Sequence, residues 1–262
     1  VNIENIKAGA GNDILTGDAF KNTFWGGAGN DILDGGYESD VLYGEDGNDI
    51  LIGGLGADIL DGGAGDDDLR GGDGDDTLIG GEANEVNGDT VNYSSKLSAL
   101  DVNLININSI TTYATAIIGT EQDSLKEIEN IIGTIYNDYI GGDNDKNILD
   151  GGSGSDTIAG LGGNDTLLGG DGDDTFMAGL DNNFLSGQDK IFEDGNDGSD
   201  YIDGGNHTID AVGTQSSSNS YSGKGDTIDY SALGATRAID VNLGITSDTA
   251  GYTAVSTVTV TN

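Results

Sequence analysis

The chain of 262 residues carries 47 Asp and Glu against nine Lys and Arg, and it contains 47 Gly but no Cys and no Pro. This composition excludes a nucleic-acid-binding protein, which needs clusters of Lys and Arg, and also a disulfide scaffold or a thiolate metal site, which needs Cys. The formal net charge of -38 opposes compaction unless counter-charge is bound, so we expect cations in the folded state. The sequence has no apolar run long enough to span a bilayer, so no transmembrane segment is predicted.

A nine-residue phrase recurs without interruption in the first part of the chain. Its clearest copy is GGAGNDILD at residues 26–34, and eight copies in register span residues 8–79. Acidic disordered segments do not place Gly, Asp and Leu at a fixed spacing, so the phrase predicts order. The Asp position of the phrase holds Asp13, Asn22, Asp31, Asp40, Asp49, Asp58, Asp67 and Asp76. The large apolar position holds Leu15, Phe24, Leu33, Leu42, Leu51, Leu60, Leu69 and Leu78.

Each phrase divides into a six-residue turn and a three-residue strand. A strand with the pattern polar, apolar, polar points one side chain inward and two outward. Two phrases then make one coil, so that alternate leucines line opposite sheets and meet in a thin core. The sequence therefore predicts an all-β fold with two sheets.

The phrase is lost between residues 82 and 132, where Val, Ile, Thr, Asn and Tyr become frequent. Apolar residues at every second position in 89–94 and 100–104 predict strands. Residues 124–130 suit either a short helical turn or a strand, and we favour the strand. We expect the Val-, Ile- and Tyr-rich segments to pack against the ends of the stacked coils, because exposed coil ends need capping.

A weaker block of phrases begins at Gly133. Asn in the Asp position offers an amide oxygen but no charge, so cation sites there should be looser. After a disturbed stretch at residues 187–194 the phrase returns once, at residues 195–203. The Asp position in this block holds Asp138, Asn147, Asp156, Asp165, Asp174, Asn183 and Asp200.

A longer repeat is superimposed on the nine-residue one. Residues 3–6 resemble residues 128–131, residues 89–94 resemble 226–231, and residues 100–104 resemble 239–243. We therefore expect the chain to be part of a longer array that continues past residue 262. The predicted domains are the end of a preceding linking segment at 1–7, a first roll at 8–81, a linking or capping segment of strands at 82–132, a second roll at 133–206 and a second linking segment at 207–262.

The phrase Gly-Gly-x-Gly-x-Asp-x-U-x, in which U is a large apolar residue, resembles the RTX, or haemolysin-type calcium-binding, repeat. The resemblance implies a right-handed parallel β-roll, or β-solenoid, with several Ca²⁺ ions between its turns and with intervening β-strand segments. In that family an ion lies between turns stacked two phrases apart, and glycine carbonyls and Asp carboxylates of both turns bind it. For this chain the resemblance implies carboxylate ligands at Asp13, Asp31, Asp40, Asp49, Asp58, Asp67, Asp76, Asp138, Asp156, Asp165, Asp174 and Asp200. It implies glycine ligands at Gly27, Gly29, Gly54, Gly56, Gly63, Gly65, Gly72, Gly74, Gly152, Gly154, Gly170 and Gly172.

The spacing suits calcium for physical reasons. Ca²⁺ takes six to eight oxygen ligands, preferably carboxylates and backbone carbonyls, and Gly reaches the positive-φ conformations that let backbone crowd around an ion. Carboxylates stacked one strand spacing apart, about 4.8 Å, repel strongly when no cation lies between them. The alternative is that each Asp only caps its own turn, and eight consecutive copies in register argue against it.

No catalytic motif is present, so we expect no enzyme activity. The patterns H-E-x-x-H, G-x-S-x-G and the P-loop are absent, and His207, the only histidine, is interpreted as a turn residue. The leading hypothesis is a calcium-dependent extracellular structural or adhesive region of a large bacterial surface protein, adhesin-like or S-layer-like, that folds on secretion. The alternative is a non-catalytic module of a secreted enzyme, of the alginate epimerase, protease or lipase type, that aids folding, export or polysaccharide contact. The RTX resemblance implies type I secretion in the unfolded state.

Two sets of outward side chains suggest contacts on the surface. Trp25 and Tyr43 end phrases two apart and should stack on one sheet, either to bind the sugar rings of a surface polysaccharide or to stiffen the sheet as a ladder. Ile14, Ile32 and Ile50 form a second ladder, with Ile52 nearby. It is interpreted either as an interface with neighbouring copies or as the ordinary preference of β-branched residues for strands.

Overall fold

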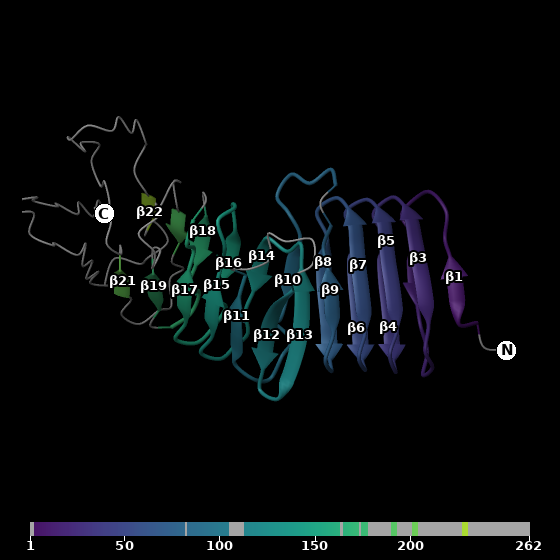
Figure 1. Ribbon diagram of the computed structural model, residues 1–262, viewed down its shortest axis with the longest axis horizontal. Helices are drawn as coiled ribbons and strands as arrows, with labels where there is room; N and C mark the ends of the chain where they lie inside the picture. The colour runs from purple at the N-terminus through teal and green to yellow at the C-terminus, as the bar shows by residue number, and fades with distance from the viewer. Residues whose placement is uncertain are drawn as a thin grey trace, which may run out of the picture.

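The computed structural model describes residues 3–81, 83–104, 113–162, 165–172 and 174–177, together with the strand backbones at 190–192, 201–203 and 227–229. The regular elements in these residues are β-strands, arranged in two sheets that run along an elongated molecule (Figure 1). The first sheet contains, in spatial order, β1 (Asn5–Lys7), β3 (Thr23–Ala28), β5 (Val41–Asp46), β7 (Ile59–Ala64), β9 (Thr77–Ile79), β13 (Glu121–Lys126), β12 (Ala114–Ile118), β11 (Leu100–Asn103), β15 (Tyr139–Gly141), β17 (Thr157–Ala159), β19 (Thr175–Met177) and β21 (Tyr201–Asp203). The second contains β2 (Ile14–Thr16), β4 (Ile32–Tyr37), β6 (Ile50–Leu55), β8 (Asp68–Asp73), β10 (Thr90–Asn92), β14 (Asn130–Ile132), β16 (Ile148–Asp150), β18 (Thr166–Leu168), β20 (Lys190–Phe192) and β22 (Thr227–Asp229).

Strands pair in parallel with the strand two phrases away. Leu33 of β4 lies beside Leu51 of β6, and Leu42 of β5 lies beside Leu60 of β7. Alternate phrases thus enter opposite sheets, as the nine-residue period predicts, and the expected all-β parallel β-solenoid is confirmed.

The core is one side chain thick on each sheet. From β4 to β9, the leucines at the large apolar position of the phrase have no exposed surface, and Phe24 of β3 is 1 % exposed. Leu15, in β2 at the end of the rod, is only half-buried. Each phrase buries only one large apolar side chain. The six-residue turns must therefore contribute much of the stability of each coil.

The linking segment continues both sheets rather than hanging outside them. In the second sheet, β10 pairs in parallel with β8 and with β14, and β14 pairs with β16. In the first sheet, β13 pairs with β9 and β11 pairs with β15, while β12 lies antiparallel between β11 and β13. The two blocks of phrases therefore belong to one rod (Figure 1).

The segment at residues 124–130 forms strands, as favoured from the sequence. Residues up to Lys126 belong to β13, and β14 begins at Asn130. Glu127, between the two strands, has a left-handed backbone with φ of 56°. Within the described part of the chain, no helix is long and apolar enough to cross a membrane.

Candidate metal centre

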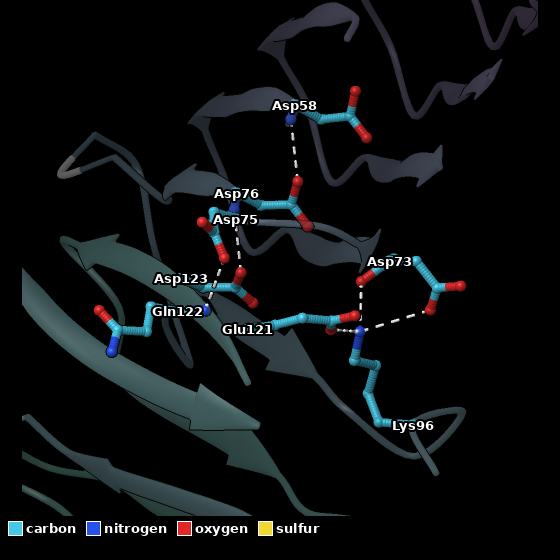
Figure 2. Close-up of polar contacts among 9 residues, drawn as sticks. Asp58, Asp73, Asp75, Asp76, Lys96, Glu121, Gln122 and Asp123 are labelled. Atoms are coloured by element: carbon cyan, nitrogen blue, oxygen red, sulfur yellow. Dashed lines mark hydrogen bonds and ion pairs between the residues drawn. The ribbon is translucent and has the colours of Figure 1, made fainter. Parts of the chain in front are cut away.

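Each Asp of the phrase lies at the end of a turn, directly before a strand, and the parallel register stacks these residues into two rows. One carboxylate oxygen, Oδ1, accepts a hydrogen bond from the backbone amide of the Asp one coil earlier. In the first row the Asp31 amide donates to Asp49 and the Asp49 amide to Asp67, each at 2.7 Å. In the second row the Asp58 amide donates to Asp76 at 2.8 Å (Figure 2).

The second carboxylate oxygen, Oδ2, is buried and has no hydrogen-bond partner at most of these positions. In the phrases from β4 to β9, the residues at the Asp position are only 1–2 % exposed. A buried carboxylate without a partner is costly, so an opposite charge is needed beside it. The buried, unpartnered Oδ2 atoms include those of Asp31, Asp40, Asp49, Asp58, Asp67, Asp76, Asp89 and Asp156.

The electrostatics of the rows favour a cation. Burial raises the pKa of Asp49 and Asp58 to about 6, of Asp67 to about 7 and of Asp76 to about 8. The amide that donates to each carboxylate opposes the increase in pKa, whereas neighbouring carboxylates of the same row add to it. A divalent cation between the turns would neutralise this charge, because a bound ion is the largest local charge in such a site.

The first glycine of the phrase keeps a small space open beside each unpartnered oxygen. A Cβ atom added at Gly26 would meet Asp31 Oδ2 and would lie 2.8 Å from the carbonyl oxygen of Gly44. A Cβ at Gly53 would meet Asp58 Oδ2 and the carbonyl oxygen of Gly71. A carboxylate of one phrase and a glycine carbonyl of the next coil therefore face the same space. This hard oxygen donor set fits Ca²⁺.

The glycines predicted as ligands occupy the second and fourth positions of the phrase, and all have a left-handed backbone. Their φ angles lie between 90° and 145°. At Gly74, a Cβ would collide with the carbonyl oxygen of Gly56 one coil earlier, so the turns stack too closely for a side chain. The conformation expected of these residues is present, and their carbonyls as calcium ligands stay a prediction. These glycines are Gly27, Gly29, Gly54, Gly56, Gly63, Gly65, Gly72, Gly74, Gly152, Gly154, Gly170 and Gly172.

In three of the turns that lack glycine at the second position, the residue that replaces it donates its backbone amide to the side-chain oxygen of the same phrase. The amide of Thr134 donates to Asp138 Oδ2 at 2.6 Å, and the amides of Asp18 and Asp143 donate to Asn22 Oδ1 at 3.1 Å and Asn147 Oδ1 at 2.9 Å. The side chain at the second position also accepts the amide two residues later, as in the hydrogen bond from Tyr136 to Thr134 Oγ1 at 3.0 Å. Asp138 thus differs from Asp31, Asp49 and Asp156, because the chain itself already partners its Oδ2.

The structure places the other predicted ligands as follows. Asp13 is half-buried at the end of the rod, and its amide donates to Asp31 Oδ1 at 2.8 Å. Asp156, Asp165 and Asp174 are 1 % exposed in the second block, where the Asp156 amide donates to Asp174. Asp200, Asn183 and His207 lie outside the described residues.

Sequence reasoning missed two aspartates of the rows in the linking segment. Asp89 Oδ1 accepts the amide of Asp67 at 2.8 Å, and Asp123 Oδ1 accepts the amide of Asp76 at 2.9 Å (Figure 2). Both residues precede an inward apolar residue by two positions, in Asp-Thr-Val and Asp-Ser-Leu. The pattern of Asp followed two positions later by an apolar residue could therefore have identified both residues. The glycine-rich half of the phrase is altered or absent at these places.

One lysine supplies a positive charge at the second row. Lys96 is 7 % exposed, and its ammonium donates to the carbonyl oxygen of Gly72 at 2.6 Å. It also pairs with Glu121 and lies 3.6 Å from an oxygen of Asp73 (Figure 2). The carbonyl of Gly72, a predicted ligand, thus already faces a cation that belongs to the chain.

A comparison with protein-family models agrees with this geometry. The model of the RTX calcium-binding nonapeptide repeat (4 copies) matches residues 7–36, 25–60, 34–69, 61–86, 127–158 and 150–185. These matches cover more than half of the chain and include both blocks of phrases. No curated protein matches the chain.

Proposed function

Because the chain belongs to the RTX calcium-binding nonapeptide repeat family, we propose that it is a calcium-dependent structural region of an extracellular bacterial protein that folds on secretion. The family binds several Ca²⁺ ions through its repeats, and the repeat itself is not catalytic. The observation that supports calcium-dependent folding is the pair of rows of buried carboxylates with unpartnered Oδ2 atoms. Without a bound cation, the folded chain would keep these carboxylate oxygens buried and unpartnered, which lowers its stability.

The proposed ligands are the buried Asp carboxylates of the rows and the carbonyls of the glycine turns. In the first block the rows pass through Asp31, Asp49 and Asp67 and through Asp40, Asp58 and Asp76. In the second block, Asp156 is a better candidate than Asp138, because its Oδ2 is unpartnered whereas that of Asp138 accepts the Thr134 amide. Asp165 and Asp174 are buried at the same position of their phrases. The division into two rolls and two linking segments stays part of this proposal.

Linkage between binding and folding supplies the mechanism. Each ion that binds only the folded state stabilises it by RT ln(1 + [Ca²⁺]/Kd), so several weak sites give a steep transition. Extracellular calcium modules have dissociation constants of about 10⁻⁴ to 10⁻³ M, far above cytosolic calcium. The chain would therefore stay unfolded inside the cell and fold outside it, which is compatible with export of an unfolded chain.

Circular dichroism tests calcium-dependent folding. We expect a disordered spectrum in calcium-free buffer, a cooperative gain of β signal at millimolar Ca²⁺, and its loss on addition of EDTA. NaCl at matched ionic strength is the control, because simple screening would act through any salt. A β signal that chelation leaves unchanged would contradict the proposal.

An adhesive role is supported by the isoleucine ladder on the second sheet. Ile14, Ile32 and Ile50 lie side by side across β2, β4 and β6, and Ile14 and Ile32 are 73 % and 37 % exposed. Such a strip suits contact with neighbouring copies of the chain. Sedimentation of the calcium-loaded protein at rising concentration tests this: Ile14→Thr combined with Ile32→Thr should abolish self-association, and a wild-type chain that stays monomeric would refute it.

The Trp25 and Tyr43 rings favour the ladder over the sugar platform. Their centroids lie 5.6 Å apart with an interplanar angle of 12°, so each ring covers one face of the other. Only the outer faces and the edges of the two rings remain available for contact with a polysaccharide. Glycan-array binding by wild type and Trp25→Ala distinguishes the two roles, because a ladder predicts no glycan signal in either protein.

A further inference from the structure

The turn between β9 and β10 is longer than the other turns of its row. Asp67 and Asp89 are bonded across 22 residues, whereas successive row members elsewhere in the first block are 18 residues apart. The turn thus holds four additional residues, and it carries Glu85 ahead of Asp89. The carboxylate of Asp66 fixes this turn, because its Oδ1 accepts the amides of Val86 at 2.7 Å and Asn87 at 3.0 Å.

Three carboxylates converge at this turn. Oxygens of Glu85, Asp89 and Glu129 lie within 4.8 Å of one another. Glu129, which precedes β14, occupies the next place in the row, since its Oε2 accepts the Asp89 amide at 2.7 Å. Asp89 directly precedes β10, which pairs with β8 of the first block, and Glu129 directly precedes β14, which pairs with β16 of the second. Because β10 and β14 are neighbours in the second sheet (Figure 1), the ligands come from both sides of the junction.

A separate observation points to a ligand at this place. Asp89 has no exposed surface, and its Oδ2 is buried without a hydrogen-bond partner. A Cβ added at Gly80 would meet both Asp89 Oδ2 and the carbonyl oxygen of Glu127. The unpartnered carboxylate oxygen and a backbone carbonyl therefore face one small space. The left-handed backbone of Glu127, φ 56°, is an uncommon conformation for a residue with a side chain, and such strain is often found at ligand sites.

We propose that Glu85, Asp89, Glu129 and the carbonyl of Glu127 bind a Ca²⁺ ion that joins the two blocks of the rod. The site differs from a nonapeptide site because its turn is expanded and two of its three carboxylates are glutamates. Carboxylate and carbonyl oxygens are the donors that Ca²⁺ prefers. The proposal rests on the calcium-dependent folding proposed above, and it adds an ion at a place where the nonapeptide phrase is broken.

The number of bound ions tests the site. We expect equilibrium dialysis with ⁴⁵Ca²⁺ at saturating calcium to give one ion fewer for Glu85→Gln and for Glu129→Gln than for wild type. Both substitutions keep the size of the side chain, and in Glu129→Gln the new amide oxygen can still accept the Asp89 amide. Asp101→Asn, an exposed carboxylate on β11 of the same segment, is the matched control and should keep the wild-type number.

Circular dichroism of the same samples separates binding from folding. A wild-type β signal together with the loss of one ion supports the site. Wild-type ion numbers in both folded variants would overturn it, and so would an equal loss in Asp101→Asn. Failure of calcium-dependent folding itself is distinguishable, because the wild-type chain would then have the same β signal in calcium and in EDTA.

Discussion

The ammonium of Lys96 donates to the carbonyl oxygen of Gly72 at 2.6 Å, across 24 residues of sequence. Lys96 belongs to the linking segment, and its side chain contacts a turn of the first block. Carboxylates of Asp73 and Glu121 lie beside its ammonium. A tethered ammonium here serves the purpose that bound ions are proposed to serve elsewhere, namely to neutralise oxygens that the turns bring together.

Replacing Lys96 should therefore weaken the rod. Lys96→Met keeps the aliphatic stem but leaves the Gly72 carbonyl without its donor, so we expect a loss of about 1–3 kcal/mol in the free energy of unfolding at saturating calcium. Urea unfolding followed by circular dichroism measures it. Lys7→Met is the control, because Lys7 is 64 % exposed where it pairs with Glu45, and such a pair contributes about 0–1 kcal/mol. Equal losses in the two variants would contradict the role of Lys96.

The calcium-free chain should depend on pH with the opposite sign from the calcium-loaded chain. Burial raises the pKa of Asp67 to about 7 and of Asp76 to about 8, against about 3.9 in the unfolded chain. The metal-free fold therefore binds more protons than the unfolded chain between pH 4 and 8, and its stability falls as pH rises through that window. With Ca²⁺ present the carboxylates must ionise to bind, so acid should release the ions and unfold the coil.

A pH series on calcium-stripped protein checks this. We expect more β signal near pH 5 than at pH 8, and the reverse order at saturating calcium. Sedimentation should accompany the spectra, because the sequence pI of about 4.1 favours association in acid. The same pH dependence with and without calcium would refute the prediction.

Thr134→Gly should open a turn that is closed in the wild-type chain. The Thr134 amide now occupies Asp138 Oδ2 at 2.6 Å, whereas Gly152 in the next coil has φ of 95° and the Oδ2 of its Asp156 is unpartnered. A glycine at position 134 is free to adopt the same positive φ, which turns the amide away from the carboxylate. We expect one additional bound Ca²⁺ by equilibrium dialysis. An unchanged ion number with an intact β signal would show that the second position does not control the site.

Gly74→Ala should destabilise the first block far more than Gly9→Ala. At Gly74, φ is 138° and a Cβ would collide with the Gly56 carbonyl, whereas a Cβ at Gly9 meets nothing within 4 Å. We expect Gly74→Ala to lower the free energy of unfolding by about 1–3 kcal/mol or more, and Gly9→Ala to stay within about 0.5 kcal/mol of wild type. Thermal unfolding at saturating calcium compares them. Similar midpoints would mean that the turns relax around the added methyl group.

The repetitive part of the molecule was predictable because its backbone repeats with the sequence. Once two phrases make a coil, Leu33 must lie beside Leu51, and Asp31 must lie beside Asp49. The linking segment was less predictable, because strand patterns at 89–94 and 100–104 do not tell which sheet each strand joins. Whether the Thr134 amide donates to Asp138 Oδ2 depends on the sign of the φ angle at Thr134. The glycine-rich phrase does not specify that angle for a threonine.

The expanded turn was hidden for a different reason. Four additional residues move Asp89 out of the nine-residue count, so a search by spacing passes over it. Its partner in the row is also remote in sequence, since Glu129 lies 40 residues away. Such contacts follow from the stacking of coils, and they become visible only when the order of strands in both sheets is known.

The hydrogen bonds along the two rows all point the same way: the amide belongs to the earlier coil and the carboxylate to the later one. This holds for Asp13 and Asp31 and still holds for Asp76 and Asp123, which are 47 residues apart. The rod therefore has a polarity, and its two ends are chemically unlike. Along these rows, removing coils from the carboxyl-terminal side leaves backbone amides without acceptors, whereas removing coils from the amino-terminal side leaves carboxylate oxygens without donors. Shortening the rod therefore exposes a different unpaired group at each end.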